Sequence, residues 1–447
     1  MANVIKLRKG LDIKLQGKAE EKTLHLKSNG KFALVPDDFV GVTPKVVVKE
    51  GDKVKAGDAL FVNKLYPEVK FASPVSGIVR EVVRGERRKV LCIKVDSDSQ
   101  QEFTDFGKKD VGSLNGEQVI NALLDAGLFG YINQLPYAVS ANPTVMPKAV
   151  FVSALRDKPL AADFEFEVKG QEQDFQTGLT ALSKIAKTYL GVGVGSALES
   201  MKDVEVNVFD GPCPAGNVGV QVNHLDPVNK GEVVWTIGDP TVVLFIGRLF
   251  NTGKVDLHRL VALCGSEVQK PMYVDMLVGE ELSTLVSNSY DASHSVRIIN
   301  GNVLTGTPTT KDGYLGAHAS EITIIPEGND ADEMLGWIFP RFKQFSVNRS
   351  YFSWLCGKKE YALDARVKGG ERHMIMSGEY DRVLPMDIYG EYLVKAIIAG
   401  DIDRQEALGI YEVSPEDFAL AEFVDSSKLE LQRIVREGLD ILRKENA

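Results

Sequence analysis

The sequence predicts a multidomain α/β protein, and three observations support this fold class. The 447 residues are enough for about three domains at roughly 100–200 residues each. Residues 46–95 carry short apolar or β-branched segments separated by Gly, Asp and Pro turns, which predicts a series of short strands. Helix and strand patterns alternate from about 110 to 255, which favours a partly parallel sheet, and a helical region is expected from about residue 331.

The composition excludes several classes of protein. Hydrophobic residues make up 44% of the chain and charged residues 26%, which is ordinary for a globular protein and excludes a disordered one. The net charge is −10, whereas sequence-independent nucleic-acid binding depends on clustered cations. We therefore expect no nucleic-acid partner.

The cysteines and the apolar segments indicate where in the cell the protein is located. Cys92, Cys213, Cys264 and Cys356 lie far apart and form no CxxC pair, so neither a zinc ribbon nor a ferredoxin-type cluster can be assigned, and a reducing compartment is expected. Residues 1–21 lack the apolar core of a signal peptide. The longest strongly apolar run, residues 242–247, is far shorter than the roughly 20 residues of a spanning helix. We expect a cytoplasmic chain without a transmembrane segment, which meets a membrane only through a partner or a surface.

The first 31 residues are locally basic, with eight Lys or Arg side chains against three acidic ones. This bias indicates either contact with an acidic partner or anionic lipid headgroups, or simply a solvated arm.

The segment GDKVKAGDALFVNKLYPEVKFASPVSGIV (residues 51–79) resembles a biotinyl/lipoyl-type β barrel. In carrier domains of that type the modified lysine lies at a hairpin tip, where this chain has Pro67. Proline has no side-chain nucleophile, and Lys64 and Lys70 are expected to face solvent, so the sequence predicts the barrel without the carrier chemistry. The basic hairpin tip from Arg84 to Lys89 is either a docking point or an exposed turn.

In the α/β region we expect helices at 117–126 and 175–190 and strands at 149–154, 204–209 and 241–246. The glycines at 191, 193 and 195 would then follow a helix, which indicates a helix-ending turn rather than a phosphate loop. The segment 247–254 would follow a strand, but its glycine spacing and Val255 do not fit a phosphate loop, which excludes an NTPase.

Further along, residues 297–325 predict a second β unit. Ser414-Pro415-Glu416-Asp417 predicts a capped helix start. Ser427 to Glu430 predicts a capping box that opens the last helix, whose inward side chains would be Leu431, Ile434, Val435, Leu439 and Leu442.

Few residues point to chemistry. The six histidines show no i, i+4 pair and no HExxH, and His258 and Cys264 are expected to serve packing. The loop GPCPAGNVG (211–219) is rich in Gly and Pro and has Cys213 at its apex, so it either carries function or is a structural crossover. No GxSxG and no base paired with Cys213 are found. We therefore assign no catalytic residue and no metal site from the sequence.

Several segments together resemble one family. They are residues 5–13 (IKLRKGLDI), the barrel segment above, 211–221 (GPCPAGNVGVQ), 297–306 (RIINGNVLTG), 369–388 (GGERHMIMSGEYDRVLPMDI) and 407–424 (ALGIYEVSPEDFALAEFV). The chain resembles, over its whole length, the A-type subunits of bacterial Na⁺-translocating NADH:quinone oxidoreductases (Na⁺-NQR). The lack of cysteine motifs separates it from the related cluster-bearing C-type subunit of the Rnf complex.

The resemblance implies one component of a translocase that oxidises NADH, reduces ubiquinone or menaquinone and exports Na⁺. The A-type component would be peripheral, on the cytoplasmic face of the inner membrane, docked chiefly on the membrane component B among partners B to F. It is implicated in quinone binding and assembly, and has no catalytic centre or redox cofactor of its own, since NADH, flavins and Fe–S clusters belong to partner chains.

The same resemblance implies the domain organisation. The expected units are an N-terminal arm plus biotinyl/lipoyl-like barrel (1–100), a Rossmann-like α/β domain (101–256), a β-grasp, soluble-ligand-binding-like unit (257–330) and a mainly helical C-terminal domain (331–447).

Some positions depart from the family. Cys213 stands where the family commonly has His, Gln221-Val222-Asn223 stand where it often has His-x-His, and Asp425 and Ser426 replace the end of an FVCP segment. A metal or proton-relay role for the 211–219 loop is therefore not expected here, and the role of Cys213 stays open. No motif assigns quinone contacts residue by residue.

Two sets of aromatic residues are candidates for a quinone surface, or alternatively for core packing. They are Trp337, Phe339 and Pro340, and Tyr351, Phe352, Trp354 and Leu355, beside Arg341, Lys343, Arg349, Lys358 and Lys359. Two other functions stay open: a non-enzymatic ligand- or polysaccharide-binding multidomain protein, and a stand-alone nucleotide-dependent enzyme.

Overall fold

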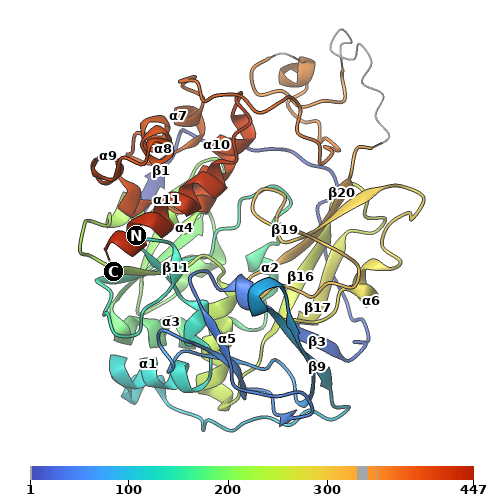
Figure 1. Cartoon of the computed structure of the whole chain (residues 1–447), viewed down its shortest axis with the longest axis vertical. Helices are drawn as coiled ribbons and strands as arrows, with labels where there is room; N and C mark the ends of the chain where they lie inside the picture. Colours follow the sequence, from blue (N-terminus) through green and yellow to red (C-terminus); the bar gives the residue numbers. More distant parts are fainter. Residues whose placement is uncertain (1–2, 330–340, 350, 447) are drawn as a thin grey trace.

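The computed structural model describes residues 3–329, 341–349 and 351–446. Their strands form four sheets of seven, six, four and three strands, and helices gather in the C-terminal part (Figure 1).

The seven-stranded sheet has the order β1-β14-β13-β12-β15-β10-β11, and its first five strands run parallel. The chain passes from β12 to β13 and β14 on one side, then returns to place β15 on the other side of β12. The strands are β1 (Asn3–Lys6), β14 (Glu205–Asp210), β13 (Lys187–Gly193), β12 (Ala149–Ser153), β15 (Val234–Ile237), β10 (Asn133–Leu135) and β11 (Val139–Ser140).

Helices cover both faces of this sheet. Val150 and Val152 of β12 share a core with α1 (Gly116–Asp125), α3 (Glu172–Ile185) and α5 (Thr241–Thr252). The alternate residues Ala149 and Phe151 face α4 (Val218–Leu225) on the other side. The alternation follows from the two-residue period of a strand, so a strand buried on both faces is apolar throughout. The short α2 (Phe164–Val168) follows β12.

Two sequence expectations in this region are wrong. The helix expected to reach residue 190 ends at Ile185, and the next residues form β13, so Gly191 and Gly193 lie in a strand rather than after a helix. The expected strand 241–246 is the first half of α5, which follows Pro240 and ends at Gly253 with φ of +76°. Both errors have one cause, because a short apolar run buried on all sides has no period that separates helix from strand.

The N-terminal β unit consists of two small sheets that share one core. The four-stranded sheet has the order β3-β9-β8-β5 and the three-stranded sheet β4-β6-β7. Leu60, Phe61, Phe71, Val79 and Ile93 are fully buried between them. The strands are β3 (Lys31–Leu34), β4 (Pro44–Val46), β5 (Lys53–Val54), β6 (Ala59–Asn63), β7 (Lys70–Ala72), β8 (Gly77–Arg84) and β9 (Val90–Ser97).

The six-stranded sheet has the order β19-β18-β20-β16-β17-β2. Its first strand along the chain, β2, belongs to the basic N-terminal arm, while β1 of the same arm joins the seven-stranded sheet. The arm is therefore held by main-chain pairing at both ends while its lysines stay exposed. The elements are β2 (Glu20–Leu24), β16 (His258–Cys264), β17 (Met272–Leu277), α6 (Ser283–Val286), β18 (Val296–Asn300), β19 (Thr307–Thr309) and β20 (Glu321–Pro326).

The C-terminal part becomes helical later than expected. Within the described residues from 341 to 379 there is one 3₁₀ turn, Phe352–Leu355, and the helices begin at Tyr380. The expected cap at Ser414 is confirmed, since Ser414 and Asp417 form a capping box on the 3₁₀ turn Pro415–Phe418. The helices are α7 (Tyr380–Val383), α8 (Gly390–Ala399), α9 (Ile402–Ala407), α10 (Ala419–Val424) and α11 (Leu431–Glu445).

The expected capping box at Ser427 is wrong. Helix α11 begins at Leu431 without a side-chain cap, because the Asp425 carboxylate accepts the backbone N–H groups of Ser427 and Leu429 and holds the segment in a turn. The expected inward face of the helix is confirmed: Leu431, Val435, Leu439 and Leu442 are buried and Ile434 is half-buried.

Candidate functional site

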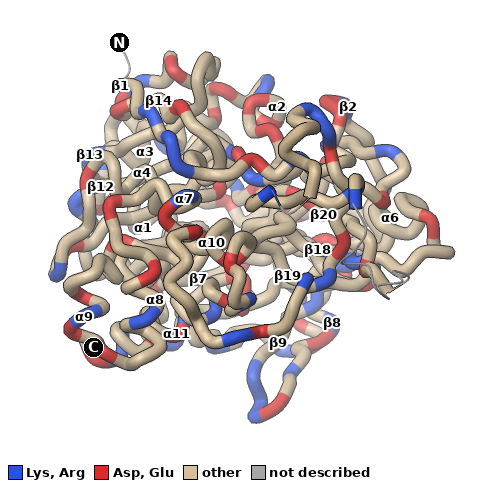
Figure 2. The backbone as a smooth tube through the Cα atoms, turned by 90° about the horizontal axis from the view of Figure 1, so that it is seen from above, with Lys and Arg blue, Asp and Glu red and all other residues tan. Residues whose placement is uncertain are grey.

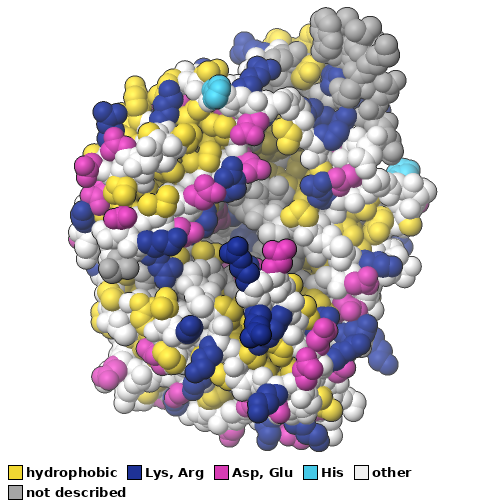
Figure 3. All heavy atoms as spheres, in the orientation of Figure 1, with side chains coloured by type: hydrophobic (Ala, Val, Ile, Leu, Met, Phe, Trp, Pro, Cys, Tyr) yellow, Lys and Arg dark blue, Asp and Glu magenta, His cyan; other side chains and the backbone are white. Residues whose placement is uncertain are grey.

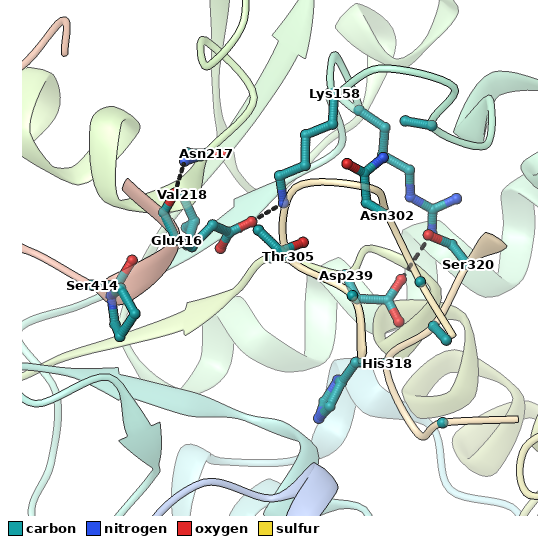
Figure 4. Close-up of a pocket in the computed structure, with 18 of the residues that line it drawn as sticks. Lys158, Asn217, Val218, Asp239, Asn302, Thr305, His318, Ser320, Ser414 and Glu416 are labelled. Carbon is teal, nitrogen blue, oxygen red and sulfur yellow. Dashed lines mark hydrogen bonds and ion pairs between the residues drawn. The ribbon is translucent and has the colours of Figure 1, made fainter. Parts of the chain in front are cut away.

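A cavity of about 740 Å³ lies between the seven-stranded sheet, the six-stranded sheet and the C-terminal helices. The surface is hollowed at the centre of the face seen in Figure 3, and Figure 4 shows side chains from all three parts around the space. The walls are residues 155–158 after β12, 216–218 before α4, 238–239 after β15, parts of 300–307 and 316–321, and 414–416.

The position of the cavity follows from the strand order. Residues after β12 and β15 line it, and these two neighbouring strands are the point where the chain changes sides in the sheet. In open α/β sheets ligands bind outside the carboxyl ends of the strands at such a point. The fold therefore makes this cavity the first candidate for a ligand site.

A buried ion network forms the floor. Arg156 donates to Glu167 and Asp239, both at 2.8 Å, and Arg259 of β16 donates to the other oxygen of Asp239 at 2.9 Å. The hydroxyl of Thr241 donates to Glu167 at 2.9 Å. Burial opposes ionisation of Asp239, but the attraction of Arg259 and Arg156 outweighs it and holds the pKa of this carboxyl well below its usual range. The network therefore fixes the two sheets to each other through charged groups.

A second ion pair ties the C-terminal part to the rim. The Lys158 ammonium donates to Glu416, as Figure 4 shows. Burial alone would lower the pKa of Lys158, but the Glu416 carboxylate raises it above its usual value. The Asn217 amide donates to the backbone oxygen of Glu416 and to Asp417, each at 3.3 Å.

Some polar groups at the cavity have no partner within the described part of the chain. The buried Tyr131 hydroxyl forms no hydrogen bond with the described residues, and the Asn217 side-chain oxygen accepts none from them. Both residues line the cavity. The His318 ring lies 5.5 Å from the Tyr131 ring and 5.7 Å from the Phe39 ring, and burial lowers the pKa of its imidazole, which favours the neutral form. Buried polar groups are normally paired, so these groups point to a ligand or water in the cavity.

Three carboxyl groups share a further property: Asp38 and Asp157 line the cavity, and Asp417 lies next to it, bonded to the lining residue Asn217. Burial raises the pKa of Asp38, Asp157 and Asp417 to about 6 in each case. Each accepts a backbone N–H, from Ala317, Gly216 and Ser414 respectively, which limits the rise. The charge around the cavity therefore changes near neutral pH.

Comparison with known proteins gives the family. Three family models match: the NqrA N-terminal barrel-sandwich hybrid domain over residues 5–98, the NqrA second alpha/beta domain over 114–255 and the NQRA C-terminal domain over 260–311. Relatives named as the A-type component of a Na(+)-translocating NADH-quinone reductase are 34% identical in Yersinia pestis bv. Antiqua and 36% in Serratia proteamaculans. Each alignment covers 99% of this chain and 100% of the relative. The chain belongs to the NqrA family.

The NqrA family descriptions agree with the expected barrel-type domain at the N-terminus and with the α/β domain after it. Among solved structures the chain aligns with an NAD⁺-reducing NiFe hydrogenase in the air-oxidized state at 10% identity and a TM-score of 0.35, over 77% of this chain and 72% of that one. Within the described residues, no helix is long and apolar enough to cross a membrane.

Three segments that carry the resemblance to NqrA meet in space. The backbone N–H of Leu11 donates to the oxygen of Cys213 at 2.7 Å, and the N–H of Gly10 donates to the oxygen of Arg382 at 2.9 Å. Asp12 accepts the N–H of Cys213 at 3.0 Å. The Cys213 thiol is buried and its pKa is raised, first by burial and then by Asp157, so it is a poor nucleophile.

The other residues considered from the sequence are spread over the molecule. His258 lies 3.4 Å from Asp275, and Cys264, at the other end of the same strand, is buried. Pro67 and Lys64 are exposed, and Lys70 is half-buried and paired with Asp125 at 3.2 Å. Figure 2 shows the β8–β9 hairpin with its basic tip extended from the body. Of the residues that the structure describes, no group of three or more His, Cys, Asp or Glu could hold a metal ion.

The core-packing interpretation of the aromatic candidates is wrong where it can be compared with the structure. Phe352, Trp354 and Leu355 are exposed and Tyr351 is half-buried, whereas Trp235 is fully buried. Trp337, Phe339 and Pro340 lie outside the described residues.

Sequence reasoning missed the residues around the cavity. Lys158 and Glu416 are 258 positions apart, and Arg156 and Asp239 lie in two further segments, so no local motif joins these four residues. A usable signal was present: charged residues follow directly on two buried strands, in Leu155-Arg156-Asp157-Lys158 and in Gly238-Asp239. Because parallel strands end at one edge, such residues converge there.

Proposed function

We propose that the chain is the NqrA component of a Na⁺-translocating NADH:quinone reductase, which contributes to quinone binding and to assembly of the complex. The observation that carries this proposal is the end-to-end match, at 34% identity over 99% of this chain and 100% of the relative, with a protein named as that component. A match of this extent includes all parts of the fold rather than one shared domain.

In this proposal the chain is a peripheral component on the cytoplasmic face of the inner membrane, docked chiefly on the membrane component B among partners B to F. NADH, flavins and Fe–S clusters belong to the partners, and quinone is the substrate of the whole complex. The absence of any CxxC pair from the sequence supports a component without a cluster of its own.

The finer fold assignments belong to the same proposal. The strand order β14-β13-β12-β15 around one crossover supports a Rossmann-like α/β domain. The six-stranded mixed sheet with α6 supports a β-grasp-type unit after it. We place the domains at 1–100, 101–256, 257–330 and 331–447, with β1 and β2 as links from the first unit to the next two.

The cavity supports a place for the quinone head group. A quinone carbonyl accepts hydrogen bonds. The Tyr131 hydroxyl and the His318 ring both line the cavity, and the Tyr131 hydroxyl has no hydrogen-bond partner among the described residues. Lys158 extends into the same space. In the proposal these three groups are the donors that hold the head group.

The assembly part of the proposal is tested by a pull-down. The C-terminally tagged chain is recovered from gently solubilised native membranes and assayed for NADH:quinone reduction with and without Na⁺. Co-purification of Na⁺-stimulated activity supports the assignment. Recovery of the chain alone, or with activity indifferent to Na⁺, would contradict it and favour the ligand- or polysaccharide-binding alternative.

The quinone part is tested with Tyr131→Phe, which removes one donor and leaves the ring. We expect a higher KM for quinone and unchanged NADH oxidation with an artificial electron acceptor. Tyr361→Phe is a matched control, because Tyr361 is also buried with an unpaired hydroxyl among the described residues but does not line the cavity. Equal effects of the two substitutions would argue against the cavity as the quinone site.

A further inference from the structure

The described residues 341–349 and 351–361, here called the aromatic loop, present large apolar side chains to solvent. Phe342 is 63% exposed, Trp354 51% and Leu355 62%, and Phe352 is 44% exposed. In Figure 1 the loop lies at the upper edge of the molecule, away from the seven-stranded sheet. Soluble proteins rarely group such side chains on their surface without a partner for them.

The aromatic loop is also strongly cationic. It contains five basic residues and one acidic residue, Glu360, in a chain whose net charge is −10. The basic side chains are those of Arg341, Lys343, Arg349, Lys358 and Lys359. The loop is therefore positively charged although the whole protein is negatively charged. The positive charge is a feature of this segment and does not follow from the composition of the chain.

Internal contacts hold the loop in one shape. The Phe342 and Phe352 rings stack at 5.5 Å, and the Arg349 guanidinium lies 5.2 Å from the centre of the Trp354 ring. The backbone N–H of Ser346 donates to the Ser353 hydroxyl at 2.9 Å. The exposed rings are therefore displayed by an ordered loop.

The base of the loop is joined to the basic N-terminal arm. The N–H of Tyr361 donates to the oxygen of Lys14 at 2.9 Å, and the N–H of Gln16 donates to the oxygen of Tyr361 at 3.1 Å. The Lys14 ammonium donates to the backbone oxygen of Gly357 at 2.6 Å. Two cationic segments that are more than 300 residues apart in the sequence thus form one surface.

We propose that the aromatic loop is a membrane-anchoring element that inserts Phe342, Trp354 and Leu355 into the interface of an anionic lipid bilayer. The lysines and arginines around them would lie at the level of the headgroup phosphates. This inference rests on the proposed function in one respect, that the complex is attached to a membrane.

Lipid fits this surface better than a protein segment does. Trp and other aromatic side chains flanked by Lys and Arg are typical of elements that lie in the membrane interface. An anionic leaflet attracts basic residues of a single sign, and the loop offers such residues with one acidic neighbour. The exposed rings are accessible to solvent, which insertion into lipid requires.

The test measures binding of the full chain to vesicles by co-sedimentation. We expect binding to vesicles of phosphatidylcholine mixed with phosphatidylglycerol, weaker binding at high salt, and little binding to pure phosphatidylcholine. Lys358→Gln with Lys359→Gln should weaken binding about thirty-fold, from about 1 kcal/mol for each basic residue near an anionic leaflet. Trp354→Ala with Leu355→Ala should weaken vesicle binding by at least about tenfold, because the apolar area buried in the bilayer is lost.

Two matched controls lie elsewhere on the surface. Lys108→Gln with Lys109→Gln removes another exposed lysine pair, and Tyr389→Ala with Tyr392→Ala removes two aromatic rings that are 70% and 59% exposed. Both control variants should bind vesicles like the parent protein. Circular dichroism of each variant checks that it is folded.

Fluorescence gives a second measurement on the same loop. The measurement uses a Trp337→Phe background, in which Trp235 and Trp354 are the remaining tryptophans. The emission should shift to the blue with anionic vesicles, because Trp354 moves from water into the interface, and adding Trp354→Phe should remove this shift. Trp235 is fully buried and contributes no change.

Absence of binding to anionic vesicles, or equal loss in the control variants, would overturn the proposal. So would a loop variant that binds vesicles normally but fails to co-purify with the membrane components, since the loop would then dock on protein. These outcomes are separate from the pull-down above, because vesicle binding by the isolated chain does not depend on the identity of its partners.

Discussion

The guanidinium of Arg259 lies 2.9 Å from the carboxylate of Asp239, although Arg259 lies in β16 of the six-stranded sheet and Asp239 follows β15 of the seven-stranded sheet. The same carboxylate is 2.8 Å from Arg156, and Arg156 is 2.8 Å from Glu167. All four side chains are about nine-tenths buried or more. One carboxylate therefore balances two arginines at the joint between the sheets.

Asp239→Ala should destabilise the protein strongly. Removing one partner of a buried ion pair leaves an uncompensated charge and costs about 3–5 kcal/mol. Urea unfolding measures this loss. Glu205→Gln is the control, because it breaks the exposed Lys187–Glu205 pair at 2.8 Å, for which we expect less than about 1 kcal/mol. A small loss for Asp239→Ala would mean that the joint does not depend on the buried network.

The contribution of Asp38 to stability should fall as the pH rises toward neutrality. Burial raises the pKa of this carboxyl in the folded protein to about 6, whereas an unfolded Asp has a pKa of about 3.9. Between these values the folded protein holds a proton that the unfolded chain has lost, so the free energy of unfolding decreases as the pH rises. Asp38→Asn keeps an oxygen for the Ala317 N–H and removes the titration.

We therefore expect Asp38→Asn to gain about 3 kcal/mol relative to the parent between a pH of about 4 and a pH above about 6. The measurement is urea unfolding across this range. Glu232→Gln should show the opposite trend, because the hydrogen bond from Lys148 lowers the pKa of Glu232 to about 2 and its contribution is lost as the pH falls. Parallel curves for Asp38→Asn and the parent would contradict the expectation.

Local signals in the sequence predicted the N-terminal β unit and the cap at Ser414 well. Turn residues at short intervals fix where those strands end, and the Ser414 cap depends on residues within three positions. The structure places the short strands β4 to β9 between Pro44 and Ser97, where the sequence predicts a series of short strands over residues 46–95. Such features need no knowledge of the rest of the fold.

The errors arose where tertiary contacts decide the structure. Gly191 lies in a strand, where an added Cβ would come within 2.1 Å of the Gln221 side chain, so its glycine serves packing between β13 and α4. Trp354 is exposed although tryptophan is mostly buried in proteins. The cavity escaped the sequence because Lys158 and Glu416 meet across 258 positions.

Gly247 should be intolerant of a side chain. It lies in the middle of α5, and an added Cβ would come within 1.8 Å of the backbone oxygen of Asp174 in α3. Backbone cannot move aside as a flexible side chain can, so we expect Gly247→Ala to cost about 1–3 kcal/mol or more in urea unfolding. Gly370→Ala is the control, since its Cβ would meet nothing within 4 Å. Equal stabilities of the two variants would show that α3 and α5 are not packed as described.

The four cysteines should react with a maleimide in an order set by their surroundings. Cys356 is exposed, Cys92 is half-buried with a pKa raised by burial, and Cys213 and Cys264 are buried. Burial raises the pKa of Cys264 to about 12 and raises that of Cys213 further, so few of these thiols ionise. We expect Cys356 to be labelled first, Cys92 slowly, and the other two after unfolding.

Intact mass and peptide mapping of the native protein check this order. Cys356→Ser should abolish the fast phase, and urea should release the remaining thiols. Rapid labelling of Cys213 in the native protein would contradict the structure, because its loop would then have to open and break the hydrogen bond between its N–H and Asp12. Since Cys356 lies in the aromatic loop, anionic vesicles should also slow its labelling, whereas phosphatidylcholine vesicles should not. That protection depends on the position of the loop at the lipid interface and on no other part of the molecule.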